Sequence, residues 1–100
     1  AGITLTVPKS DVTENYAYFP VVFDGYRYTR DQVYEKLKNH DIFARKYFYP
    51  TINTYSCYKD QFDSDATPVA QYIAQRVLTL PLYADLSLED VDRICAIITT

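Results

Sequence analysis

At the middle of this sequence stands the stretch Ile42-Phe43-Ala44-Arg45-Lys46-Tyr47-Phe48-Tyr49-Pro50, from which the rest of the fold can be worked out. The stretch carries two cations among four aromatic residues, its successive side chains would point to alternate faces of a strand, and it stops at Pro50, which has no backbone N–H for a ladder. This pattern predicts a β-strand over residues 43 to 48.

Three further strands are predicted on either side of this stretch. Apolar residues alternate with threonines from Ile3 to Val7. An almost unbroken run of aromatic and β-branched residues follows at positions 16 to 23, and a short apolar run at 77 to 80 predicts a buried strand. Because Pro20 cannot donate to a ladder, we expect the 16–23 strand to lie at a sheet edge or to carry a bulge.

Three helices are predicted from their N-terminal caps. Thr29 and Gln32 have the spacing of a capping box. Thr67 places a capping hydroxyl before Pro68 at the first helical position, and Ser87 precedes a helix with acids in its first turn. The apolar residues expected to face the core are, helix by helix, Val33 and Leu37; Val69, Ile73 and Val77; and Leu88, Val91, Ile94 or Cys95, and Ile98.

The order β-β-α-β-α-β-α predicts an α+β fold, a two-layer α/β sandwich in one domain that spans residues 1–100. We expect a small, largely antiparallel or mixed sheet of three or four strands, covered on one side by three helices. Residues 50 to 66 form a long connection rich in Tyr, Ser and Asp, and connections of this length tend to be functional or mobile.

Composition excludes several classes of protein. With 48% hydrophobic residues in 100, the chain is globular, and its net charge of −3 argues against nucleic-acid or membrane partners. No run approaches the roughly 20 apolar residues of a membrane span, and no charged-then-apolar leader opens the chain. The chain has no methionine, so its start at Ala1 suggests either a processed chain or a piece excised from a longer protein.

The cysteines and the single histidine predict neither a disulfide nor a metal site. Cys57 and Cys95 lie far apart without metal-type spacing, which is typical of free thiols in a reducing cytoplasm. His40 has no second imidazole to share a metal with, and it is expected at the surface near a helix end.

No catalytic residue is expected in this chain. Gly2 and Gly25 are isolated, so there is no glycine-rich phosphate loop, and no serine has a histidine motif around it. The acid pairs at 63/65 and 89/90 fit a solvated loop and a helix N-terminus better than a general acid/base couple. By its own residues, the chain is not expected to be an enzyme.

The best binding candidate is the face of the predicted central strand that carries Arg45. On a strand, Arg45 and Tyr47 share a face with Phe43 and Tyr49, while Lys46 points to the other face. An arginine among aromatic rings suits a phosphate or carboxylate together with a ring or sugar. The same pattern fits an edge strand whose cations prevent aggregation and whose rings are core. The spacing alone leaves both interpretations open.

An RNA-binding strand is the other interpretation of the aromatic runs. The stretch Asn15-Tyr16-Ala17-Tyr18-Phe19-Pro20-Val21-Val22-Phe23 looks somewhat like the aromatic RNP1 strand of RNA-recognition motifs. It lacks the basic residue and the glycine that open that motif, a proline interrupts it, and the domain is acidic. RNA binding is therefore not expected.

A series of short motifs resembles the C-terminal small domain of the DegT family, whose members are pyridoxal-phosphate-dependent aminotransferases of nucleotide-linked deoxysugars. The motifs are, in order, Asn15-Tyr16-Ala17-Tyr18-Phe19-Pro20, Thr29-Arg30-Asp31 with Leu37, Ile42 to Pro50, Pro68-Val69-Ala70, Leu80-Pro81-Leu82-Tyr83-Ala84-Asp85-Leu86, and Asp90-Val91-Asp92-Arg93-Ile94. The resemblance extends from about Ile3 to Ile98, and the ordered series is more specific than any one motif.

The resemblance implies a fold-type-I aminotransferase that works as a homodimer in the bacterial cytoplasm and supplies amino sugars for surface polysaccharides. It would move an amino group from glutamate to a keto-deoxysugar on dTDP or a similar nucleotide. The resemblance places pyridoxal 5'-phosphate and its lysine in an upstream large domain, so no cofactor-binding residue is assigned here and the chain alone is expected to be inactive.

By the resemblance, only the segment around residues 45 to 49 of this chain faces substrate. It helps to close the active site at the mouth of the nucleotide-sugar site, and the residues we expect there are Arg45, Tyr47 and then Tyr49. Two other readings stay open: a free-standing carbohydrate- or nucleotide-binding module that uses its aromatic strands, and a structural domain that covers the cofactor domain without touching substrate.

Overall fold

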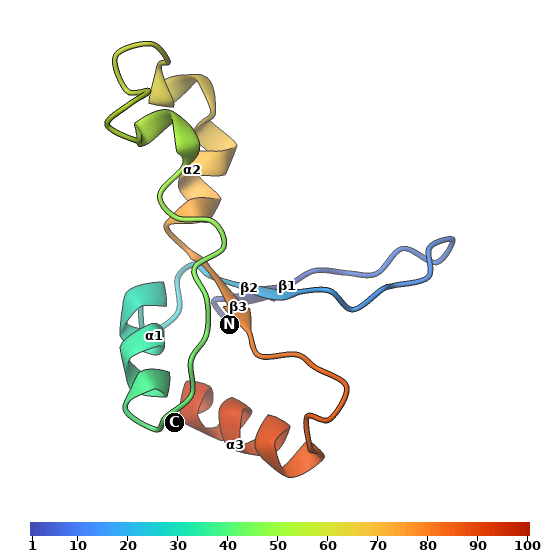
Figure 1. Ribbon diagram of the computed structural model, residues 1–100. Helices are drawn as coiled ribbons and strands as arrows, with labels where there is room; N and C mark the ends of the chain where they lie inside the picture. The colour runs from blue at the N-terminus through green and yellow to red at the C-terminus, as the bar shows by residue number, and fades with distance from the viewer.

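A three-stranded antiparallel sheet forms the centre of the computed structural model, which describes residues 1–100 apart from the side chain of Ser64 (Figure 1). The strands are β1 (Ile3–Leu5), β2 (Phe19–Phe23) and β3 (Val77–Leu80), and their order in the sheet is β1-β2-β3. The helices are α1 (Arg30–Lys38), α2 (Pro68–Ala74) and α3 (Leu88–Thr99), with 3-10 turns η1 (Ile52–Thr54) and η2 (Ser64–Ala66). The predicted α+β fold class is confirmed.

Pro20 lies in the central strand of the sheet, so the expectation of an edge strand or a bulge was wrong. The Phe23 N–H donates to the Arg76 carbonyl at 2.9 Å, and bonded and non-bonded positions alternate along an antiparallel pair. Pro20, opposite Thr79, therefore turns its nitrogen toward the β1 side. There β1 has already ended, because its last pair is Leu5 with Val21. The missing N–H thus interrupts no ladder bond.

The first two strands are shorter than predicted. Residues 6 to 18 leave the sheet as a long hairpin arm without strand pairing (Figure 1). The apolar side chains of Val7, Val12 and Tyr16 on this arm are exposed. Alternation up to Val7 and the aromatic and β-branched run from residue 16 predicted strands here, but in the described structure residues 6 to 18 pair with no strand.

The strand predicted over residues 43 to 48 is reduced to a single bridge, which corrects that prediction. Arg45 and Thr79 exchange backbone hydrogen bonds of 2.9 and 2.7 Å along the free edge of β3. Immediately afterwards the chain turns, and the Tyr49 N–H donates to the Lys46 carbonyl at 2.9 Å. The assigned faces agree with the structure as far as Tyr47, since Phe43, Arg45 and Tyr47 line one cleft whereas Ile42 and Ala44 are buried. Tyr49, which was assigned to the face of Arg45, instead contacts Arg30 of α1.

Helices α1 and α3 pack together against one face of the sheet, and their apolar side chains close the core. The capping box of Thr29 with Gln32 is confirmed, and the Ser87 hydroxyl accepts from the Asp90 N–H at 3.1 Å. The core consists of Val21, Phe23, Val33, Leu37, Ile42, Ala44, Leu78, Ile94, Ile97 and Ile98. Of the residues predicted to face inward on α3, Ile94 and Ile98 are buried, but Leu88, Val91 and the alternative Cys95 are exposed. The buried residues of this helix all lie in its second half.

Helix α2 does not cover the sheet as predicted. It lies beyond the N-terminal end of β3, into which it leads, and it packs against η2 (Figure 1). Its predicted inner residue Val69 is exposed. The Thr67 hydroxyl does not cap the helix by a hydrogen bond but accepts from the Asn53 side-chain amide at 3.0 Å. Helix α2 and the turns η1 and η2 form a separate lobe, which is held together by contacts with the connection of residues 50 to 66 rather than by the core.

The end of α3 is bound by the loop that follows β2. The Tyr26 hydroxyl donates to the Ile98 carbonyl at 2.7 Å, and the Arg27 guanidinium donates to the Thr99 carbonyl. The Tyr28 hydroxyl reaches the next carbonyl, that of residue 100, at 3.5 Å. The last carbonyls of a helix have no partner within it, so these side chains complete the helix end.

The two cysteines and the single histidine lie at the surface. Cys57 and Cys95 are free and exposed, and the His40 Nδ1 lies 2.9 Å from the Lys36 carbonyl at the end of α1, as expected. In the part of the chain that the structure describes, no helix has the length and apolar character needed to cross a membrane.

Candidate functional site

Two of the three predicted site residues line one cleft beside the sheet. It has a volume of about 230 Å³, and we call it the arginine cleft. Its lining residues are Ala17, Tyr18, Phe43, Arg45, Tyr47, Thr79, Leu80, Pro81 and Leu82. The bridge to Thr79 fixes the backbone of Arg45, while its side chain is exposed and makes no hydrogen bond or ion pair with the described residues. A guanidinium held in this way is available to a ligand.

Tyr18 is a residue of the arginine cleft that the sequence did not single out. Its ring meets that of Tyr47 edge to face, with centroids 5.6 Å apart. The ring comes from the hairpin arm just before β2, whereas Tyr47 follows the bridge to β3. The only sequence signal was that Tyr18 belongs to an aromatic run, and this run was expected to be a strand.

Tyr49 and Lys46 face α1 and do not line the arginine cleft. The Arg30 guanidinium carbon lies 4.8 Å from the centroid of the Tyr49 ring. The Lys46 ammonium lies 3.0 Å from the Asp31 carboxylate and 4.5 Å from the centroid of the Tyr34 ring. The structure thus brings Arg45 and Tyr47 together and, as predicted for Lys46, turns that side chain away from them.

Arg30 is a buried cation that joins three parts of the fold. It is 2% exposed, and its Nη1 donates to the carbonyls of Ala74 at 2.8 Å and Val77 at 3.1 Å. Its Nε donates to the Asp31 carboxylate at 2.7 Å. A buried charge is tolerated only when it is paired and hydrogen-bonded in this way.

The electrostatics of this region hold Asp31 in its charged form. Partial burial alone would raise the pKa of the Asp31 carboxyl, but the hydrogen bonds from Lys46 and Arg30 and their positive charges outweigh it and lower the pKa. Away from the cleft, the hydrogen bond that Tyr72 donates to Asp24 raises the pKa of the phenol.

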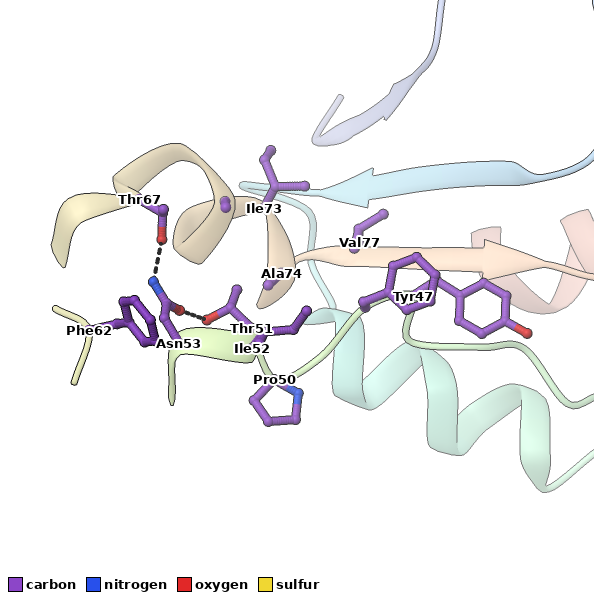
Figure 2. A pocket seen from close by; sticks show the side chains of 12 residues that line it. Tyr47, Pro50, Thr51, Ile52, Asn53, Phe62, Thr67, Ile73, Ala74 and Val77 are labelled. Atoms are coloured by element: carbon purple, nitrogen blue, oxygen red, sulfur yellow. Dashed lines mark hydrogen bonds between the residues drawn. The ribbon is translucent and has the colours of Figure 1, made fainter. Parts of the chain in front are cut away.

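A second and larger cavity lies on the other side of the turn that carries Tyr47 (Figure 2). Its volume is about 590 Å³, and most of its lining is apolar. Its lining residues are Tyr47, Phe48, Pro50, Thr51, Ile52, Asn53, Phe62, Thr67, Ala70, Ile73, Ala74 and Val77. We call it the lobe cavity, because it separates the turn from the lobe around α2.

A chain of polar side chains closes one end of the lobe cavity. The Asn53 amide donates to the Thr67 hydroxyl at 3.0 Å and accepts from the Thr51 hydroxyl at 2.8 Å (Figure 2). The Gln71 amide donates to the same Thr51 oxygen at 2.7 Å. These four residues connect η1 to α2, so the long connection of residues 50 to 66 is partly ordered by contacts that its composition did not reveal.

Comparison with known proteins shows that the chain is similar to aminotransferases. A profile of the DegT/DnrJ/EryC1/StrS aminotransferase family matches residues 1–99. The chain is 42% identical over 96 residues to dTDP-4-amino-4,6-dideoxy-D-glucose transaminase of Escherichia coli, a match that covers 93% of this chain and 26% of that protein. It is 37% identical over 87 residues to the transaminase of the same name from Shigella dysenteriae, covering 86% and 24%.

Solved structures agree at the level of the fold. A DegT DnrJ EryC1 StrS aminotransferase from Brucella abortus superposes with a TM-score of 0.82 at 20% identity, over 98% of this chain and 26% of that one. The aminotransferase TlmJ from Streptoalloteichus hindustanus gives a TM-score of 0.79 at 23% identity, over 97% and 25%. The chain spans about a quarter of the length of the curated relatives that it matches. Since the family profile covers nearly every residue, the chain belongs to the DegT/DnrJ/EryC1/StrS aminotransferase family.

Proposed function

We propose that this chain is the C-terminal small domain of an aminotransferase that moves an amino group from glutamate to a keto-deoxysugar carried on dTDP. The observation that carries the proposal is the 42% identity to a dTDP-4-amino-4,6-dideoxy-D-glucose transaminase, which extends over 93% of this chain. The match covers 26% of that protein, so in this proposal the chain is about one quarter of a longer protein, and we place the remaining domain upstream.

In this proposal the arginine cleft is where the chain contacts the nucleotide sugar. The Arg45 guanidinium has no ion pair among the described residues, and it can bind two oxygens of a diphosphate at once. The rings of Tyr47 and Tyr18 stand beside it and offer apolar faces to a sugar or a base. The cleft helps to close the active site, and the substrate role expected for Tyr49 stays a prediction.

Aminotransferases of this family depend on pyridoxal phosphate, but neither the arginine cleft nor the lobe cavity fits that cofactor. The cofactor needs a free lysine amine and a cradle for its phosphate. Among the described residues, no lysine lines the arginine cleft or the lobe cavity, and the nearby Lys46 is paired with Asp31. We therefore place the cofactor in the upstream domain, and we expect the isolated chain to be inactive. In the same proposal, which here rests on the family resemblance alone, the complete protein is a cytoplasmic homodimer.

The complete protein that contains this chain provides the test. Purified with pyridoxal phosphate, it is incubated with glutamate and a dTDP-linked 4-keto-6-deoxysugar, and the amino sugar and 2-oxoglutarate are quantified by mass spectrometry. We expect both products in equal amounts. The same sugar on UDP or GDP is the matched control, and it is expected to react more slowly.

Two outcomes would contradict the proposal. A complete protein that is no longer than this chain would exclude an upstream cofactor domain. A protein that carries the cofactor but transfers no amino group to any nucleotide-linked keto sugar would exclude the reaction.

A further inference from the structure

We propose that Arg30 and Asp31, at the start of α1, are positioning residues that clamp the turn 46–49 and so aim Tyr47 into the arginine cleft. The inference rests on the proposed function, because it explains how the proposed substrate site is held in shape. It also changes the role of Tyr49, whose ring becomes part of the clamp rather than a contact to substrate.

The first half of the clamp is the buried guanidinium of Arg30. Its hydrogen bonds to the carbonyls of Ala74 and Val77 fix it at the junction of α2 and β3. With its position set in this way, it offers its face to the Tyr49 ring at 4.8 Å, well within the range of a cation–π contact. The C-terminal end of the turn is therefore anchored through a buried, hydrogen-bonded side chain to the junction of α2 and β3.

The second half of the clamp is Asp31, the next residue of α1. Its carboxylate accepts from the Arg30 Nε at 2.7 Å and from the Lys46 ammonium at 3.0 Å. The ammonium also lies over the Tyr34 ring. Two consecutive helix residues thus hold the two ends of the turn, Lys46 and Tyr49.

The two ends of the turn are also joined to each other. The Tyr49 N–H donates to the Lys46 carbonyl, which places Tyr47 and Phe48 at the tip of the turn. Their rings stack with centroids 4.9 Å apart. Tyr47 lines the arginine cleft, and both Tyr47 and Phe48 line the lobe cavity. The tip of the turn therefore forms part of the wall of both cavities.

A clamp of this kind predicts that binding depends on atoms that never touch the substrate. Misplacing a contact residue by about 1 Å can cost on the order of 100-fold in activity. Releasing either end of the turn should therefore weaken the recognition of the nucleotide sugar. The reaction with glutamate should change little, because that substrate does not need the arginine cleft in the proposed function.

Tyr49→Leu and Tyr49→Phe, made in the complete protein, separate the clamp from a direct contact. Leucine removes the ring that Arg30 covers, whereas phenylalanine keeps the ring and removes only the hydroxyl. We expect Tyr49→Leu to raise the KM for the nucleotide sugar by on the order of 10-fold with kcat nearly unchanged. The conservative Tyr49→Phe should restore the wild-type KM. Asp31→Asn should act in the same direction as Tyr49→Leu but less, because the Asp31–Lys46 pair is partly exposed.

Hydrogen exchange gives a second readout that needs no substrate. The amide of Tyr49 closes the turn, and losing a cation–π contact should speed its exchange by about 2- to 30-fold in Tyr49→Leu. Arg30→Lys keeps the charge but cannot make all of the contacts of a guanidinium, so the same amide should exchange faster there too. The exchange of core amides in β3 serves as the internal reference for folding.

The results separate failure of the clamp from failure of the proposed function. Unchanged exchange at Tyr49 in Tyr49→Leu, or equal KM effects of Tyr49→Leu and Tyr49→Phe, would overturn the clamp. Faster exchange without any change in the KM for the nucleotide sugar would also overturn it, since the turn would then position nothing. If Arg45→Ala has no effect either, the assignment of the arginine cleft to the substrate fails as well; if Arg45→Ala does impair the enzyme, only the clamp fails.

Discussion

Replacing Arg45 by alanine in the complete protein should impair the use of the nucleotide sugar and leave the fold intact. The bridge to Thr79 uses only backbone atoms of Arg45, so the substitution keeps both hydrogen bonds. The side chain is exposed and has no ion pair among the described residues, so the free energy of unfolding should change by less than about 0.5 kcal/mol. What is lost is the contact to the ligand. A hydrogen bond to a charged group contributes about 1.5–3 kcal/mol, which corresponds to about 10- to 150-fold in kcat/KM.

Steady-state kinetics with each substrate varied in turn measures this loss. The decrease in kcat/KM should appear when the dTDP-linked keto sugar is varied and should be much smaller when glutamate is varied. Lys38→Ala is the matched control, because it removes an exposed cation of α1 that does not line the arginine cleft. Equal losses for both substrates, or equal effects of Arg45→Ala and Lys38→Ala, would refute the assignment of Arg45 to the nucleotide sugar.

Three further predictions concern stability and are checked by urea or thermal unfolding of the complete protein. Leu78→Ala should lower the free energy of unfolding by about 2–5 kcal/mol, because Leu78 is 0% exposed, whereas Val69→Ala at a 74% exposed position should change it by less than about 0.5 kcal/mol. Ser87→Ala should cost about 1 kcal/mol, since the hydroxyl caps α3; no loss of stability would mean that water replaces the cap. The lowered pKa of Asp31 stabilises the fold above the ordinary value of 3.8, and this contribution disappears as the pH falls through the lowered pKa. The difference in stability between wild type and Asp31→Asn should therefore shrink in acid, and a difference that grows there would contradict the sign.

Local signals in the sequence predicted the local parts of the fold well. The capping box at Thr29 and the cap at Ser87 depend on residues three positions apart, and both are present in the structure. The strand over residues 43 to 48 failed because its extent depends on a partner. The free edge of β3 offers only Thr79 to Arg45, and alternation in one segment carries no information about the length of its neighbour.

The candidate site could be predicted only in part, because some of its contacts join segments that are far apart in the sequence. Arg45 and Tyr47 share one side of an extended segment, and that local geometry held. Tyr18 is nearly thirty positions away from them in the sequence, so its place beside Tyr47 follows from the pairing of β2 with β3. The contact of Arg30 with Tyr49 likewise depends on how α1 meets the turn, which no spacing within either segment expresses.

The binding of the α3 end by the loop after β2 has a consequence for how the domain opens. Helix ends usually fray, which lets their amides exchange with solvent independently of the rest of a protein. Here the carbonyls of Ile98 and Thr99 and that of the C-cap residue Thr100 accept from the side chains of Tyr26, Arg27 and Tyr28, respectively. Fraying of α3 would break these bonds and release the loop that leads from the sheet into α1. The helix end and the loop should therefore open as one cooperative unit. Because this loop directly follows β2, each opening should also loosen the end of the sheet's central strand.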